Sequence, residues 1–377
     1  MQGLTLCALP ALPLVLVIQN REGKSRIKTQ SSSFLVFTKP IPNSLVNMNP
    51  NLPFPLVNGA FIIDTTTLEY YTTCRRAYEY YALEKRRSAS NKWALSFGLA
   101  FHHAMQAKYD QDADVDAQLS VVREFFNENP PPPDDHRDTT YMTELLMGYD
   151  LFYTDEPFTV VASDTGQRMV EVPFCLPLKN ADGTPFTVFL EKFTPGLGGA
   201  VEGSQLLLQE VPVFYSGRID MLTLWDGLLY PLDHKTTSIM GDKYFDEFQN
   251  SQQPIGYSWA VREITGKAPG GYVINAVATR RLTKSGAGIE YRRQKYFLEP
   301  ERIDEWLENT RYIIQDIVAD YHRGYFPMET KWCVAKYGKC PYFDVCVLPA
   351  PARPMLLASN LYETNDWSPL NQPKGSA

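Results

Sequence analysis

The chain has 377 residues, a formal net charge of −7 at neutral pH and a hydrophobic content of 44%. This length allows one large domain or two ordinary ones, with enough apolar residues for a globular core. A wholly basic nucleic-acid binder is excluded, but a local basic groove is not, because salt confines electric fields to roughly 10 Å.

Residues 1–55 are predicted to form an irregular N-terminal extension rich in Pro, Ser and Asn. Residues Leu4 to Ile18 are apolar like a signal peptide, but no Lys or Arg precedes them, prolines interrupt them and no clear cleavage site follows. The run is shorter than the roughly 20 residues of a membrane span, and no later segment could span a membrane. We therefore expect a soluble, cytoplasmic protein with no membrane partner.

The remaining chain reads as helices, then strands, then helices, which favours an α/β or α+β domain. Helices are predicted at 65–86 (capped by Thr65 or Thr66), 93–110, 115–127, 138–154, 244–265 and 299–323. Strands are predicted near 168–178, 185–191, 271–280 and 289–298, with a hairpin at 217–236. The tail from residue 349 is predicted to be irregular.

The second predicted helix carries two adjacent histidines. His102 shares an apolar stripe with Leu95, Leu99, Met105 and Tyr109, so it is predicted to point inward, whereas His103 is predicted to face solvent. A lone histidine on such a stripe is more often a core residue than a ligand. Neutral imidazole is nevertheless a common metal ligand, and acidic residues elsewhere make His102 a candidate.

The hairpin is the most informative segment for function. Asp226-Gly227 between two apolar runs predicts a two-residue turn, which places Asp220 opposite Asp233 with their Cβ atoms roughly 4.5–5.5 Å apart. Lys235, two residues after Asp233, then points to the same face.

Two opposed carboxylates repel each other, and burial increases the cost. Either Lys235 or a divalent ion such as Mg²⁺ or Mn²⁺ could offset them. The alternative is a surface hairpin with solvated acids, which the apolar residues on both faces make less favourable. Pro231 predicts a bulge or an edge position that would shift the register.

The cysteines suggest a second site. Cys333, Cys340 and Cys346 lie close together in the chain, and Cys74 is the best candidate for a fourth ligand. In a reducing compartment such a group indicates zinc or an iron–sulfur cluster, and the spacing does not choose between them. The alternative is a set of unrelated buried thiols, as Cys175 in a predicted strand would be.

Two further features are ambiguous. Gln253 and Tyr257 share a helix face, which is usually ordinary surface. Basic residues cluster on the last predicted hairpin and could be either solvated charges or a phosphate-contacting strip: Arg280, Arg281, Lys284, Arg292, Arg293 and Lys295.

These segments, taken in order, resemble the RecB-like branch of the PD-(D/E)XK nuclease superfamily. The matching motifs are Gly98-x-x-x-His102, Gly217-Arg218-Ile219-Asp220, Asp233-His234-Lys235-Thr236 and Gln253-x-x-x-Tyr257. The cysteine order resembles the iron–sulfur members, which include CRISPR-associated and phage-encoded exonucleases, although the gap between Cys333 and Cys340 is longer than in many. The resemblance implies a restriction-endonuclease-like core over 56–348, with a mixed central sheet flanked by helices.

The resemblance also implies roles for individual residues. His102, Asp220, Asp233 and the backbone carbonyl of His234 would bind Mg²⁺ or Mn²⁺, Lys235 would orient or activate water, and Gln253 and Tyr257 would support the site. Cys74, Cys333, Cys340 and Cys346 would hold a [4Fe–4S] cluster that joins the two ends of the domain, with zinc as the alternative metal.

We therefore expect a metal-dependent DNA nuclease, an exonuclease in this reading, that acts on single strands or duplex ends in recombination, repair or phage replication. Recombination or replication proteins are its expected partners. Two alternatives remain: a non-catalytic DNA-binding or assembly module with the same fold, and a zinc-binding structural protein.

Overall fold

The computed structural model describes residues 52–89, 93–194, 205–281, 288–335 and 338–364. Its α-helices are α1 (Thr65–Thr73), α2 (Arg75–Tyr78), α3 (Trp93–Gln111), α4 (Val115–Glu128), α5 (Thr139–Phe152), α6 (Asp242–Asp246), α7 (Gln252–Thr265), α8 (Pro300–Arg323), α9 (Phe343–Cys346) and α10 (Arg353–Leu357). Its strands are β1 (Leu56–Val57), β2 (Ala60–Ile63), β3 (Arg86–Ser88), β4 (Thr159–Val160), β5 (Val170–Pro177), β6 (Thr187–Thr194), β7 (Gln205–Trp225), β8 (Leu228–Thr237), β9 (Gly271–Thr279), β10 (Ile289–Phe297), β11 (Val334–Ala335), β12 (Gly338–Lys339) and β13 (Tyr362–Thr364).

The main sheet is mixed, as predicted. Its order is β1-β2-β7-β8-β9-β10, and β4, β5 and β6 pair with other stretches of β7. β2 runs parallel to β7 and β8 runs parallel to β9, whereas the remaining pairs are antiparallel. β7, which is 21 residues long, is therefore the strand on which the fold is organised.

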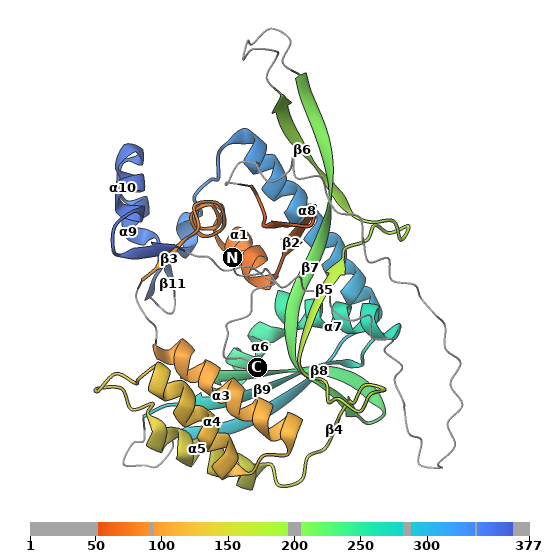
Figure 1. Ribbon diagram of the computed structural model, residues 1–377, viewed down its shortest axis with the longest axis vertical. Coiled ribbons are helices and arrows are strands. Elements are labelled where there is room, and N and C mark those ends of the chain that lie inside the picture. Colours follow the sequence, from red (N-terminus) through yellow and green to blue (C-terminus); the bar gives the residue numbers. More distant parts are fainter. Residues whose placement is uncertain (1–51, 90–92, 195–204, 282–287, 336–337, 365–377) are drawn as a thin grey trace, which may run out of the picture.

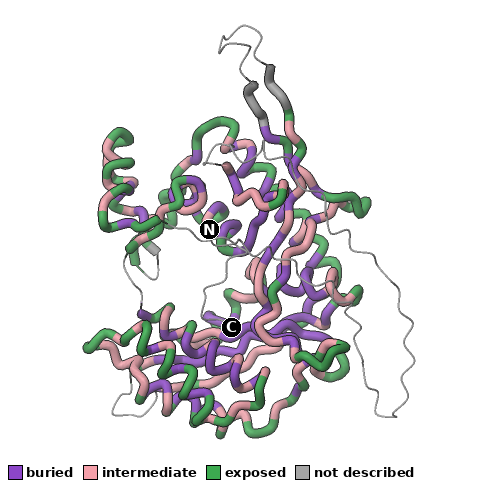
Figure 2. The backbone as a smooth tube through the Cα atoms, in the orientation of Figure 1, coloured by how far each residue is buried: buried purple, intermediate pink, exposed green. Residues whose placement is uncertain are grey.

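Helices cover both faces of this sheet (Figure 1). Ile274 and Ala276 of β9 pack into the cluster that contains α1, α7 and α8, whereas Val273 and Val277 pack into the cluster that contains α3, α4 and α5. The alternation of one strand between two apolar layers explains why its residues are buried throughout (Figure 2). The predicted α/β architecture is confirmed.

The hairpin between β7 and β8 has the predicted turn and register. Asp226 and Gly227 have φ angles of 51° and 79°, as in a turn with two left-handed residues, and Trp225 pairs with Leu228. The pairing continues to Met221 and Leu232 without a bulge.

The expected disturbance at Pro231 is wrong. Pro231 lies opposite Leu222, and Leu222 directs its N–H to Met169 and its carbonyl to Val161 on the other side of β7. The backbone groups of Leu222 are therefore already hydrogen-bonded without Pro231, and a residue that lacks an N–H fits at position 231.

Several predicted helices differ in detail. The helix predicted over 65–86 breaks at Cys74, and the one predicted over 244–265 is interrupted between α6 and α7. Asp64, rather than Thr65 or Thr66, caps α1 by accepting from the Thr67 N–H at 2.8 Å. Among the described residues, no helix is long and apolar enough to cross a membrane.

The ends of the domain also differ from the prediction. Residues 1–51 lie outside the described part, but Phe54 is buried against Phe61 and residues 56–57 form β1. The tail expected to be irregular from 349 contains α10 and β13, and β13 pairs with β3. This pairing joins residues 362–364 to residues 86–88, a contact too distant in the chain for local patterns to reveal.

Candidate functional site

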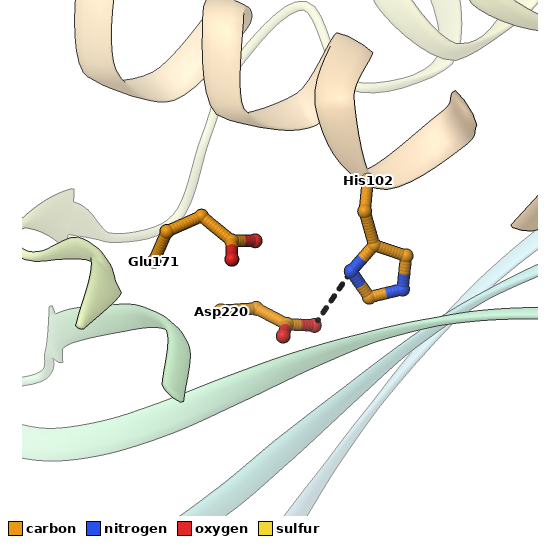
Figure 3. A group of neighbouring side chains, drawn as sticks. All are labelled: His102, Glu171 and Asp220. Carbon is orange, nitrogen blue, oxygen red and sulfur yellow. Dashed lines mark ion pairs between the residues drawn. The ribbon is translucent and has the colours of Figure 1, made fainter. Parts of the chain in front are cut away.

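Three potential metal ligands converge at one face of the sheet. His102 of α3, Glu171 of β5 and Asp220 of β7 each offer a ligand atom, and these atoms all lie within 4.8 Å of one another (Figure 3). His102 Nδ1 lies 3.4 Å from Asp220 Oδ2. A nitrogen and several oxygens at this spacing form a donor set suited to a divalent cation.

Strand register explains how the acids meet. β5 pairs Val170 with Met221 and Val172 with Ile219, so Glu171 lies level with Asp220. On the other side of β7, the hairpin register leads directly from the last pair, Met221 and Leu232, to Asp220 and Asp233. Acids from three neighbouring strands therefore fall in one row across the sheet.

The predicted lysine lies beside this row. Lys235 Nζ is 2.6 Å from Asp233 Oδ2 and donates to Gln253 Oε1 at 2.8 Å. Gln253 Nε2 in turn lies 3.1 Å from the Tyr257 hydroxyl. Gln253 and Tyr257 are thus connected to Lys235, and the interpretation of them as ordinary helix surface does not hold.

Glu171 is the site residue that sequence reasoning missed. Its φ of 51° is left-handed, which is uncommon for a residue with a side chain within a strand. Such strained backbone concentrates at functional sites. Arg218 Nη1 holds the carboxylate at 2.9 Å. The one available signal was a single acid within the apolar run Met169-Val170-Glu171-Val172.

Burial and crowding shift the ionisation of the site. Burial, followed by the nearby carboxylates of Asp233 and Glu171, raises the pKa of Asp220 well above its usual value. Burial disfavours protonated Lys235, but Asp233 and Asp220 outweigh it and the pKa of Lys235 is raised. Burial lowers the pKa of His102, which favours the neutral, ligating imidazole. A bound cation would relieve the excess negative charge.

Of the two histidines of α3, His103 is not placed as expected. His102 reaches the acidic group with its side chain 27% exposed, whereas His103 is buried and its ring lies 5.4 Å from that of Phe125. Leu95 and Leu99, which were assigned to the inward stripe, are exposed. The helix packs on both the sheet and α4, so the prediction of a single apolar stripe misassigned which residues of α3 are buried.

His234 contributes its backbone to the site. Its N–H donates to Asp220 Oδ2 at 2.7 Å. Its side chain packs near Phe101 and Tyr109 in the layer of α3 and α5. Burial, and then the neighbouring His102 and Arg293, lower the pKa of His234 well below its usual value, so its imidazole is neutral.

The four predicted cysteines surround one cavity. Cys74, Cys333, Cys340 and Cys346 line a space of about 150 Å³ together with Tyr70 and Trp332. Burial, followed by the other three thiols, raises the pKa of Cys346 to about 11. Cys175 lies apart in β5, where burial raises its pKa to about 11, and Cys7 lies outside the described residues.

The thiols are more widely spaced than a single zinc ion requires. Four sulfurs at about 2.3 Å from one zinc would lie roughly 3.8 Å apart. Among the residues with described side chains, no three of the cysteine sulfurs lie within 4.8 Å of one another. The four thiols are the right residue type for either zinc or an iron–sulfur cluster, and their spacing does not choose between the two.

The basic cluster on β9 and β10 is largely paired within the protein. Arg292, Arg293 and Lys295 contact Asp242, Glu156 and Asp226 at 2.7, 2.5 and 2.9 Å. Arg280 pairs with Glu290, and Arg281 donates to the Asp134 carbonyl. Lys284 lies outside the described residues. These contacts do not support a free phosphate-contacting strip.

A mixed sheet between helical layers, with a row of acids, a histidine and a lysine at one face, defines an α/β protein with a restriction-endonuclease-like fold and a candidate metal centre. The family model of the PD-(D/E)XK nuclease superfamily matches residues 65–347, and the chain belongs to this superfamily. No curated protein matches the chain significantly. Members of the superfamily generally use Mg²⁺ or Mn²⁺, which agrees with the oxygen-rich donor set.

Proposed function

We propose that this chain is a metal-dependent DNA nuclease of the RecB-like branch. The supporting observation is the convergence of His102, Glu171 and Asp220 beside the ion pair of Asp233 and Lys235. We assign His102, Glu171, Asp220 and Asp233 as the metal-binding side chains, with the His234 carbonyl as a further ligand. Glu171 is added to the set that the sequence motifs indicate.

The residues have separate roles in phosphodiester hydrolysis. A divalent ion bound by these residues would supply a Lewis acid that polarises the phosphate and lowers the pKa of a water molecule. Attack of the water oxygen on phosphorus forms one P–O bond as the bond to the leaving sugar oxygen breaks. The attacking water releases a proton to solvent, and the leaving oxygen takes one up from solvent. Negative charge increases on the phosphoryl oxygens, where the Lys235 ammonium is placed to stabilise it.

We propose that Lys235 orients or activates the attacking water and stabilises charge. In the metal-free protein, Asp233 and Asp220 raise its pKa, which favours the ammonium form. Gln253 fixes the direction of this ammonium group from the neighbouring helix. Tyr257 supports Gln253 in this arrangement.

We further propose an exonuclease that acts in recombination, repair or phage replication. The order of the four motifs and the accompanying cysteines support this more specific assignment. In this proposal Cys74, Cys333, Cys340 and Cys346 hold a [4Fe–4S] cluster. The cluster would join Cys74, between α1 and α2 near the start of the matched region, to the segment that follows α8.

The nuclease assignment is tested with purified protein, Mg²⁺ or Mn²⁺, and linear single strands labelled at the 5′ or the 3′ end. Asp233→Ala and Lys235→Ala should abolish cleavage, and Asp304→Ala, which changes a carboxylate exposed to solvent on α8, is the matched control. Closed circular strands should resist an exonuclease. Equal cleavage by the wild-type protein and both site variants would refute the assignment, and tight DNA binding without cleavage would favour a non-catalytic module.

The cysteine assignment is tested by metal analysis after anaerobic purification. We expect about four iron atoms per chain and broad absorbance in the visible region, both lost in Cys346→Ser and retained in Cys175→Ser. Colourless protein with one zinc per chain would refute the iron–sulfur cluster.

A further inference from the structure

Among the described strands, only β9 pairs with the segment that carries Asp233 and Lys235. Pairing between β7 and β8 ends at Met221 and Leu232, whereas pairing between β8 and β9 continues from Leu232 to Thr237. Beyond Leu232, the His234 N–H donates to the Asp220 carboxylate and not to a backbone carbonyl of β7. The main chain at residue 234 therefore sets where both catalytic side chains lie relative to Asp220.

The side chain of residue 234 anchors this segment in the layer of α3 and α5, where its ring lies 6.0 Å from that of His102. Strand alternation directs Asp233 and Lys235 to the site and His234 away from it. His234 is buried, and its Nδ1 lies 2.7 Å from Nδ2 of Asn275, its direct partner in the ladder between β8 and β9. Since the amide nitrogen of Asn275 donates, His234 Nδ1 accepts and its proton lies on Nε2.

Asn275 is itself fixed by a buried polar network. Its Nδ2 lies 2.9 Å from the Tyr149 hydroxyl, and its Oδ1 accepts from Arg293 Nε at 3.3 Å. Arg293 also donates to Tyr149 at 3.0 Å and to Glu156 at 2.5 Å. The network thus connects β8 and β9 to β10 and α5.

Apolar side chains could fill the same part of the core without this buried polar network. The Arg293 side chain is only 5% exposed, and burial of an Arg–Glu pair carries a desolvation penalty that apolar residues would avoid. Satisfied buried networks fix one arrangement of the groups that they join. Here the joined groups include the residue between Asp233 and Lys235, and none of the network side chains belongs to the metal-ligand group.

We propose that His234, Asn275 and Arg293 are positioning residues, which act from the layer of α3 and α5 to align Asp233 and Lys235 with Asp220. The inference rests on the proposed function for its catalytic readout. Its structural readout, the affinity for Mn²⁺ without DNA, is independent of cleavage. Residues that orient metal ligands typically change metal affinity or activity by about 10- to 100-fold.

The test compares two substitutions at one position. His234→Phe keeps a ring but removes the acceptor, whereas His234→Asn keeps an acceptor near the place of Nδ1. Free Mn²⁺ is measured by electron paramagnetic resonance, and kcat and KM for labelled single-stranded DNA are measured on the same preparations. We expect His234→Phe to weaken Mn²⁺ binding and lower kcat by about 10-fold or more with KM within about threefold, and His234→Asn to restore most of both.

Ser258→Ala controls for the general loss of a buried hydrogen bond, because Ser258 bonds only to the Pro254 carbonyl within α7 in the described structure. The proposal is overturned if His234→Phe binds Mn²⁺ as tightly as the wild-type protein, or if its losses match those of Ser258→Ala at equal melting temperature. Wild-type protein that binds Mn²⁺ but cleaves no DNA would refute only the nuclease, and the Mn²⁺ comparison would still decide the positioning role. Wild-type protein that binds no Mn²⁺ would refute both.

Discussion

Arg218 reaches Glu171 across the ladder between β5 and β7, with Arg218 Nη1 2.9 Å from Glu171 Oε2. Arg218 lies two residues before Asp220 on β7 and shares its face of the sheet. Its Nε is buried and has no hydrogen-bond partner among the described residues. The pair therefore connects Arg218 to a proposed metal ligand whose backbone is itself strained.

We predict that Arg218→Met weakens Mg²⁺ and Mn²⁺ binding by about 10-fold, because Glu171 loses the group that orients it. Glu171→Gln should weaken binding in the same direction. If Arg218 acts through Glu171, the double variant should be little worse than Glu171→Gln alone. The Mn²⁺ dissociation constants of the four proteins test this, and additive losses would show that Arg218 acts independently of Glu171.

Metal binding should weaken as the pH falls. The pKa of Asp220 is raised in the metal-free protein, so an entering cation must displace a proton once the pH drops below that pKa. The stability of the metal-free protein has the opposite pH dependence. Because the pKa of Asp220 is raised in the folded state, the free energy of unfolding falls as the pH rises through that pKa. Mn²⁺ should therefore increase the melting temperature more at pH 8 than at pH 5.5.

Asp220→Asn is the informative comparison for this pH effect. An amide cannot take up the proton, so metal-free Asp220→Asn should lose less stability than the wild-type protein as the pH rises. Thermal unfolding with and without Mn²⁺ at both pH values measures this. Identical pH dependence of stability in the two proteins would show that a group other than Asp220 takes up the proton.

The parts of the site that could be predicted are those fixed by short-range geometry. A two-residue turn at Asp226 and Gly227 sets the hairpin register, and alternation then brings Asp220, Asp233 and Lys235 to one face. Helix periodicity likewise predicted a helix at 299–323, and α8 spans Pro300–Arg323. In each case the determining interactions lie within a few residues of one another.

The parts that were missed depend on contacts between distant segments. Glu171 joins the site because β5 pairs with β7, about fifty residues later, and because its backbone adopts a left-handed conformation that no local pattern demands. His103 is buried against Phe125 of α4. The strand at 362–364 requires β3 as its partner. No periodicity within these segments specifies such pairings.

The N-cap of α1 should give the protein a stability that depends on pH. Burial raises the pKa of Asp64 to about 6, and its carboxylate accepts from the N–H and the hydroxyl of Thr67 at 2.8 and 2.6 Å. Because the folded-state pKa is raised, the stabilisation is present below the unfolded pKa near 4 and is lost as the pH rises through 6.

Asp64→Asn retains the cap acceptor and removes this titration. Between pH 4 and pH 7 the wild-type protein should lose on the order of 3 kcal/mol of unfolding free energy relative to the variant. Urea unfolding at both pH values tests this, with Asp114→Asn at the exposed cap of α4 as the control. A constant difference between the wild-type protein and Asp64→Asn would refute the prediction.

The hairpin turn should contribute to stability without taking part in catalysis. Gly227 has a φ of 79° and no neighbouring atom within 4 Å of an added Cβ, so Gly227→Ala should cost about 1 kcal/mol through backbone strain alone. Gly241→Ala is the matched control, since Gly241 is equally open but has a φ of 161°, which any residue can adopt. Urea unfolding should separate the two variants, while cleavage per folded molecule remains at the wild-type level in both. A loss of cleavage in folded Gly227→Ala would mean that the turn influences the row of acids six residues away, and that the hairpin register is less firmly held than its pairing indicates.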